Sequence, residues 1–134
     1  MSRMETRTDK PSVWPCLSYR DARAAIRFLA DAFGFVERAC YTEGDAVAHA
    51  ELAWPSGAGA IMLGSADESN DLDRPTGSAL LYVVTDDPDA LLARATAAGA
   101  EVVRDLKDED YGNRTFTVRD PEGNLWSFGT YPGS

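Results

Sequence analysis

Hydrophobic residues recur at helical spacing in one early segment of the chain. Asp21 opens this segment and Gly34 follows it. The apolar positions fall at i, i+3, i+4 and i+7, on one face of a helix, and they are Ala25, Phe28, Leu29 and Ala32. Asp21 can accept hydrogen bonds from the N–H groups at a helix start, and Gly34 suits the left-handed residue that ends a helix. The pattern predicts a helix over residues 21–33.

Short apolar segments on both sides of this helix predict β-strands. One precedes the helix at residues 12–19, and three follow it at residues 35–42, 46–54 and 60–64. The last three are separated by the turn-forming sequences Glu43-Gly44-Asp45 and Pro55-Ser56-Gly57. Such spacing is typical of an antiparallel meander.

The same order of elements then repeats. A strand is predicted at residues 78–85, a helix at 86–98 closed by Gly99, and strands at 101–106, 114–119 and 125–131. We interpret the chain as an α+β fold of two tandem βαβββ modules, 13–64 and 78–131, joined by a polar linker, 65–77. Each module is too small to bury a core alone, so we expect them to form one domain over 13–131. The polar residues 1–12 are expected to be disordered.

Composition limits the possible partners and the location. The chain has 134 residues and a net charge of −9, which disfavours nucleic acid as a partner and attracts cations. It contains no apolar run long enough to span a membrane. Cys16 and Cys40 lack CxxC spacing, so we expect two reduced, buried thiols in a cytoplasmic protein.

Six short motifs occur in the same order as in a known family, and the resemblance that they carry spans about residues 13–131. They are Tyr19-Arg-Asp-Ala22, Ala32-Phe-Gly-Phe35, Val84-Thr-Asp-Asp-Pro-Asp-Ala90, Ala97-Ala-Gly-Ala-Glu-Val102, Tyr111-Gly-Asn-Arg114 and Arg119-Asp-Pro-Glu-Gly-Asn124. With the paired βαβββ pattern, they make the chain resemble the vicinal oxygen chelate superfamily. This superfamily includes glyoxalase I, extradiol dioxygenases, fosfomycin-resistance enzymes and bleomycin-resistance binding proteins. The resemblance implies a curled mixed β-sheet cleft with helices outside, and a homodimer.

The same resemblance places four metal-ligand positions at or near Trp14, Glu51, Leu80 and Ser127. Only Glu51 offers a strong ligand to a divalent metal, because Trp14 and Leu80 have no donor atom and Ser127 has a neutral hydroxyl. We therefore predict no metal and no other cofactor. Trp126 and Phe128 should face away from Ser127. Asp120 and Glu122 lie in a turn that Pro121 and Gly123 favour, where we expect them to stabilise the turn or to be solvated.

The cleft that the resemblance implies would be lined mainly by rings and aliphatic groups. We predict that eight side chains contact a ligand: Trp14, Cys16, His49, Glu51, Leu80, Tyr82, Arg114 and Ser127. A buried carboxylate at Glu51 requires a partner, which can be a cationic group of the ligand, His49 or Arg114. His49 and Glu51 lie on the same face of one strand, which leaves two alternatives. The pair could contribute two ligands to a metal site displaced from the usual family position, or it could act as a general base.

These observations favour a metal-free binding protein that resembles bleomycin-resistance proteins and sequesters an aromatic or cationic drug-like compound. Two alternatives are a metal-dependent lyase, isomerase or dioxygenase, and a cofactor-independent enzyme with His49 or Glu51 as its base.

Overall fold

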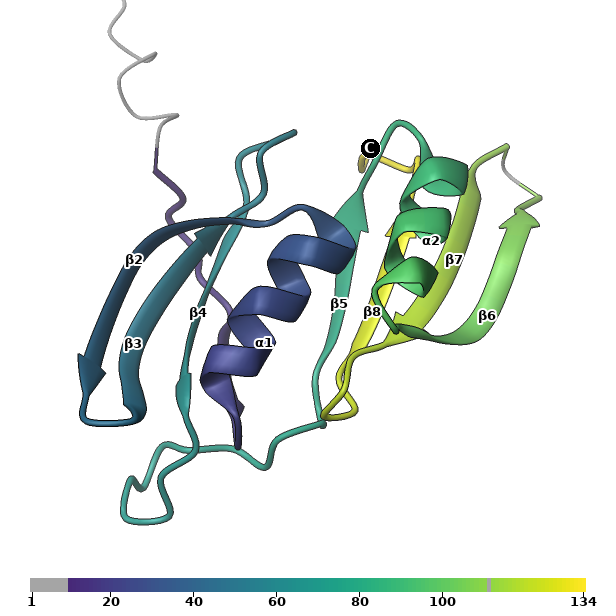
Figure 1. Cartoon of the computed structure of the whole chain (residues 1–134). Helices are drawn as coiled ribbons and strands as arrows, with labels where there is room; N and C mark the ends of the chain where they lie inside the picture. Colours follow the sequence, from purple (N-terminus) through teal and green to yellow (C-terminus); the bar gives the residue numbers. More distant parts are fainter. Residues whose placement is uncertain (1–9, 111) are drawn as a thin grey trace, which may run out of the picture.

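The computed structural model describes residues 10–110 and 112–134, so most of the predicted disordered tail lies outside the described residues. The elements form two four-stranded mixed sheets, one from each half of the chain (Figure 1). The first sheet has the order β1-β4-β3-β2 and consists of β1 (Cys16–Tyr19), β2 (Val36–Glu43), β3 (Ala46–Ala53) and β4 (Ala60–Ser65). The predicted α+β class and repeated βαβββ order are therefore confirmed.

The second sheet repeats this topology. Its order is β5-β8-β7-β6, with β5 (Leu80–Val84), β6 (Glu101–Asp108), β7 (Arg114–Arg119) and β8 (Leu125–Gly129). In each sheet the strand before the helix pairs in parallel with the last strand of its module, and the other pairs are antiparallel. No helix or strand forms between β4 and β5.

The first helix begins as predicted but changes its geometry halfway. It comprises α1 (Ala22–Phe28) and a π-helical turn, η2 (Leu29–Phe33). The Asp21 carboxylate accepts a hydrogen bond from the Ala24 backbone N–H at 3.1 Å, and Gly34 closes the helix with φ 90°. The prediction of a single α-helix over 21–33 is therefore wrong for its last turn. This turn is a wider π-helix, in which Leu29 and Phe33 remain buried.

The second helix, α2, runs from Pro88 to Ala97. Asp87 caps it by accepting from the Ala90 N–H at 3.1 Å, so the helix starts after the predicted Asp86. Pro88 suits the first turn of the helix because a backbone N–H at that position would have no acceptor within the helix, and proline has no N–H. Within the described part of the chain, no helix is long and apolar enough to cross a membrane.

Aromatic rings from both modules form one core. Phe33 lies with its ring centre 5.4 Å from that of Trp126 and 4.7 Å from that of Phe128. Trp126 and Phe128 lie on the face opposite to Ser127, as strand alternation predicts, and the structure shows that both are fully buried there. η2 packs against α2. Because the two halves share these contacts, neither module has a separate core.

The turn between β7 and β8 contains a buried carboxylate, that of Asp120. It accepts hydrogen bonds from the Tyr19 hydroxyl at 2.6 Å and the Trp126 indole N–H at 3.1 Å. It also accepts from the backbone N–H groups of Glu122 and Asn124. Burial raises the pKa of Tyr19 above its usual range, and the neighbouring Asp120 carboxylate adds to this effect. Asp120 therefore stabilises the turn and ties it to β1 of the other module.

Glu122 makes a second connection between the modules. Its carboxylate accepts from the backbone N–H of Arg20 at 2.7 Å and that of Asp21 at 2.8 Å, next to the start of α1. The Thr76 hydroxyl donates to it at 2.8 Å. Burial alone would raise the pKa of Glu122, but these hydrogen bonds outweigh it and hold that pKa below its usual value.

Each sheet has one covered face and one open face. In β7 and β8 the residues that face the core are buried, as Phe116, Val118 and Trp126 show. The residues between them, such as Thr117 and Ser127, face the opposite side and are only partly buried. The core therefore lies between the two sheets, and two sheet faces point away from it.

Replacing Asp120 by alanine is expected to destabilise the protein by about 3 kcal/mol or more, because buried donors such as the Tyr19 hydroxyl and the Trp126 indole N–H would lose their acceptor. Urea unfolding followed by circular dichroism measures the change. Asp45→Ala, an exposed position in the turn between β2 and β3, is the control and should stay within about 0.5 kcal/mol of the wild type. An equal effect of both substitutions would show that the Asp120 contacts contribute nothing specific.

Glu122 is expected to make stability depend on acid pH. Its pKa is lower in the folded chain than the usual 4.5, so its contribution is complete above that value and is lost as pH falls through the folded pKa. Urea midpoints measured between neutral pH and pH 3 should decline less steeply for Glu122→Gln than for the wild type. Parallel curves for the two proteins would contradict this assignment.

Candidate functional site

The open face of the first sheet carries three of the predicted ligand contacts, Cys16, His49 and Glu51. Strand pairing aligns Ala39, Glu51, Met62 and Cys16 in one row across β2, β3, β4 and β1. The thiol of Cys16 is exposed on this sheet and that of Cys40 is half-buried, so the prediction of two buried thiols is wrong. β1 is the edge strand of the sheet, which leaves Cys16 without a neighbour on one side.

His49 and Glu51 form a pair on this open face. The Nε2 atom of His49 lies 2.8 Å from Oε2 of Glu51. The side chains are 38% and 30% exposed, so Glu51 is less buried than the sequence suggested. The ring of Tyr41 stacks on that of His49 with a centre distance of 6.2 Å. Of the three partners considered for Glu51, the structure supplies His49.

The open face of the second sheet is rich in hydroxyl groups. Pairing places Tyr82, Ser127, Thr117 and Arg104 in one row across β5, β8, β7 and β6. The hydroxyl oxygens of Ser127 and Thr117 are 2.6 Å apart and share a hydrogen bond. Ser127 thus shares a hydrogen bond with a neighbouring hydroxyl, and among the described residues no basic side chain hydrogen-bonds to it.

A hollow of about 520 Å³ lies on this face. Its walls combine hydroxyl groups with charges of both signs, and the lining residues are Tyr82, Arg104, Asp105, Lys107, Glu109, Thr115, Thr117 and Ser127.

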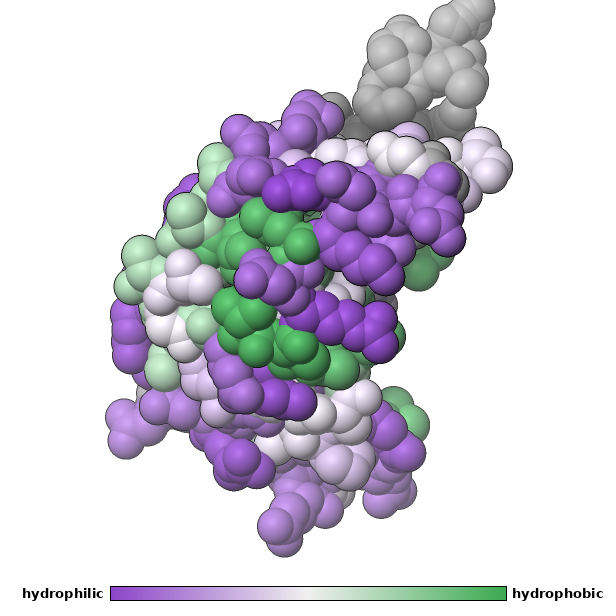
Figure 2. All heavy atoms as spheres, turned by 90° about the vertical axis from the view of Figure 1, so that its right-hand side faces the viewer, coloured by the Kyte–Doolittle hydropathy of each residue, from purple (hydrophilic) through white to green (hydrophobic). Residues whose placement is uncertain are grey.

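Viewed from the side of β6, hydrophobic atoms form a central band between hydrophilic regions (Figure 2). Val102 and Val103 of β6 are about two-fifths exposed, at 41% and 40%.

Of the remaining predicted contacts, Arg114 and Trp14 lie apart from these groups, and Leu80 lies on the open face of the second sheet. Arg114 binds Asp89 at 2.9 Å and Asp108 at 3.0 Å, which accounts for the raised pKa of its guanidinium and for the lowered pKa of Asp89. It is therefore not the partner of Glu51. Leu80 is 66% exposed on the second sheet. Trp14 precedes β1, and its indole N–H donates to the Pro11 carbonyl at 3.1 Å.

The four positions aligned with metal ligands do not fit a metal ion. Glu51 is the one carboxylate among them and already binds His49. The nitrogen of Trp14 is a donor without a lone pair, Leu80 has no polar atom, and Ser127 offers a neutral hydroxyl. Across residues 10–110 and 112–134, no three His, Cys, Asp or Glu side chains gather in a way that could hold a metal.

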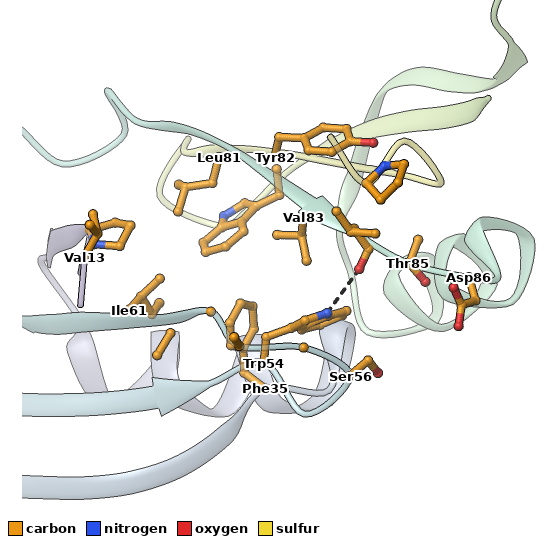
Figure 3. A pocket seen from close by; sticks show the side chains of 18 residues that line it. Val13, Phe35, Trp54, Ser56, Ile61, Leu81, Tyr82, Val83, Thr85 and Asp86 are labelled. Atoms are coloured by element: carbon orange, nitrogen blue, oxygen red, sulfur yellow. Dashed lines mark hydrogen bonds between the residues drawn. The ribbon is translucent and has the colours of Figure 1, made fainter. Parts of the chain in front are cut away.

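A third feature, which sequence reasoning missed, is an apolar pocket between the two sheets (Figure 3). It measures about 530 Å³ and combines rings from three separated segments, those of Phe35, Trp54 and Trp126. Trp54 directly precedes Pro55, which indicates the end of a strand but not what the indole faces. The position of this pocket depends on how the modules pack, so the sequence pattern gave no signal for it.

Comparison with known proteins assigns the chain to a family. Residues 13–128 match the model of the Glyoxalase/Bleomycin resistance protein/Dioxygenase superfamily. The uncharacterized protein Mb0911c of Mycobacterium bovis is 32% identical, and the match covers 90% of this chain and 83% of that protein.

Solved structures share the fold. TioX from Micromonospora sp. ML1 is 31% identical with a TM-score of 0.73, over 88% of this chain and 98% of TioX. TnmS3, an antibiotic binding protein from Streptomyces sp. CB03234, is 23% identical with a TM-score of 0.70, over 88% of this chain and 94% of TnmS3. The family match and the repeated βαβββ sheets lead to one conclusion: the chain belongs to the glyoxalase/bleomycin resistance protein/dioxygenase superfamily.

Proposed function

We propose that this protein binds an aromatic, drug-like small molecule without a metal and without altering it. In this proposal two copies form a homodimer, and the open first-sheet face of one copy faces the open second-sheet face of the other. The observation that carries the proposal is the division of the predicted ligand contacts. Cys16, His49 and Glu51 lie on one open face, and Tyr82 and Ser127 lie on the other.

The apolar content of the two faces supports a partner. Tyr41 is 63% exposed on the first sheet, and Leu80 and Val84 are 66% and 38% exposed on the second. Large apolar side chains gathered on a sheet face indicate an interaction surface more often than a solvated one. A second copy would cover both faces and create two equivalent clefts.

The chemistry of the faces indicates the class of ligand. The first face supplies the Tyr41 and His49 rings beside the Glu51 carboxylate. The second supplies the hydroxyls of Thr117 and Ser127 and the charge of Arg104. Stacking rings combined with a few polar groups suit a flat aromatic compound that carries several oxygen atoms. The net charge of −9 favours a cationic substituent on that compound.

The similarity to TnmS3 agrees with this class, because that protein is an antibiotic binding protein with the same fold. We extend antibiotic binding, and with it a role in resistance, to this chain as part of the proposal. A cytoplasmic location is part of it too, since both cysteines are free thiols.

One observation favours a second function. The His49 and Glu51 side chains are in contact at 2.8 Å and both are partly exposed, an arrangement in which a carboxylate orients an imidazole base. A cofactor-independent enzyme would use this pair to remove a proton from its substrate. Recovery of the bound compound after long incubation separates the two functions, because sequestration returns it unchanged and catalysis does not.

Leu80→Glu is expected to convert the dimer into a monomer and to weaken ligand binding at least about ten-fold. The new charge would lie in the apolar contact between copies. Sedimentation velocity measures the mass, and fluorescence polarisation of doxorubicin, a fused-ring compound with one amine and many oxygen atoms, measures binding.

Leu72→Glu is the matched control, because Leu72 is 83% exposed in the segment between β4 and β5. It should leave both mass and binding unchanged. The shared cleft would be contradicted if the wild type is a monomer and Leu80→Glu binds doxorubicin as tightly as the wild type does.

Added Ni²⁺, Zn²⁺, Mn²⁺ or Fe²⁺ is expected to raise the melting temperature by less than about 2 °C, because one carboxylate and one imidazole bind a metal weakly. The double variant Leu80→His/Ser127→Glu adds two donors and should respond more strongly to the same ions. A large rise for the wild type, or stoichiometric metal in elemental analysis, would support the metal-dependent enzyme instead.

A further inference from the structure

The apolar pocket between the sheets is distinct from the two open faces. Along β5, Leu81 and Val83 are half-buried and line the pocket, while Leu80, next to Leu81, is exposed on the open face. Tyr82, between Leu81 and Val83, borders both the pocket and the hollow on the open face. Ile61 of β4 lines the opposite wall (Figure 3). A molecule in this pocket would therefore contact both modules of one copy without entering the proposed cleft between copies.

Three aromatic rings shape the pocket. The ring of Phe35 lies 5.3 Å from that of Trp54 and 5.6 Å from that of Trp126, centre to centre. None of these pairs is stacked face to face, since the ring planes are inclined by 58° and 68°. Phe35 and Trp126 are buried, at 5% and 0% exposure, and form the floor of the pocket. Trp54 is partly exposed, so its ring surface is available to a further aromatic group at tilted or edge-on geometry.

The Trp54 indole is fixed across the pocket. Its N–H donates to the Val84 carbonyl at 3.1 Å, the hydrogen bond drawn in Figure 3. β5 is the edge strand of its sheet, so this carbonyl points away from β8 and would otherwise lack a partner in the sheet. The contact joins the end of β3 to β5 and holds the ring in place before any ligand arrives, which reduces the entropic cost of binding.

The pocket has an acidic end. Thr85 and Asp86 line it beside the start of α2 (Figure 3). The Asp86 side chain is exposed and makes no hydrogen bond or ion pair within the described part of the chain. An unpaired carboxylate beside an apolar wall attracts a cation that is attached to a ring system.

We infer that this pocket is a second small-molecule site, which binds a planar aromatic compound bearing a cationic amine. The Trp54 ring contacts the aromatic part, above the floor that Phe35 and Trp126 form, and Asp86 attracts the amine. A volume of about 530 Å³ lies within the range of pockets that take drug-sized ligands. The site shares Tyr82 with the hollow on the second sheet but lies between the two sheets of a single copy, outside the proposed cleft between copies.

The test uses 9-aminoacridine, a planar cation, with the full chain and with fluorescence polarisation as the readout. Val83→Trp fills the pocket and is expected to weaken binding at least about ten-fold. Val103→Trp on β6, outside the pocket, is the matched control and should bind like the wild type. Ala58→Trp is a second blocking variant at an exposed loop position on the pocket rim, where it cannot disturb the core.

The charge at the pocket end is tested separately. Asp86→Asn should weaken binding of 9-aminoacridine about two- to five-fold, as expected for an exposed charge pair. Asp45→Asn removes the same charge from the distant turn between β2 and β3 and should have no effect. Anthracene-9-carboxylate, a planar anion of similar size, should bind more weakly than 9-aminoacridine.

Ser127→Trp separates this site from the proposed cleft, because it obstructs the open face of the second sheet. It is expected to weaken doxorubicin binding and to leave 9-aminoacridine binding unchanged. Loss of 9-aminoacridine binding in Ser127→Trp but not in Val83→Trp or Ala58→Trp would overturn the inference, and so would a wild type that does not bind this probe.

Discussion

The buried Asp120 carboxylate is the contact on which the arrangement of the two modules depends. It lies in the turn of the second module, yet its shortest hydrogen bond, 2.6 Å, comes from Tyr19 at the end of β1 in the first. A buried charge is tolerated only when its hydrogen-bonding capacity is filled, and here two side chains and two backbone groups fill it. With Glu122, which binds the backbone before α1, this turn fixes how the first helix meets the second sheet.

That fixed arrangement explains why two sheet faces remain open. Phe33, Trp126 and Phe128 occupy the space between the modules, so each sheet uses one face for this shared core. The remaining faces hold most of the chemically distinctive residues, including the His49–Glu51 pair and the Ser127–Thr117 pair. In β8, for example, the rings of Trp126 and Phe128 are buried on one side of the strand and the Ser127 hydroxyl lies on the other, while Tyr41 and Tyr82 are exposed rings on the open faces.

The donor chemistry separates this chain from metal-dependent members of its superfamily. At the four positions that the family resemblance aligns with metal ligands, this chain has an indole, an aliphatic group and a hydroxyl in addition to Glu51. Under the proposed function, stacking and shape would supply most of the affinity for a ligand. Apolar or ring surface with few polar groups occurs twice, on the open faces and in the pocket beside Trp54.

The sequence by itself determined the elements and their repetition, because these depend on local pattern. Asp21 and Gly34 mark the two ends of the first helix, and strand alternation placed Trp126 and Phe128 on the face opposite to Ser127. Tertiary structure alone decided what Glu51 and Arg114 bind, because an ion pair forms between groups that the fold brings close together. Glu51 contacts His49, and Arg114 contacts Asp89 and Asp108. It also decided the exposure of Cys16, the π-helical turn and the pocket at Trp54, because each depends on where one module packs against the other, or on which strand lies at a sheet edge. No periodicity along a chain encodes those long-range contacts.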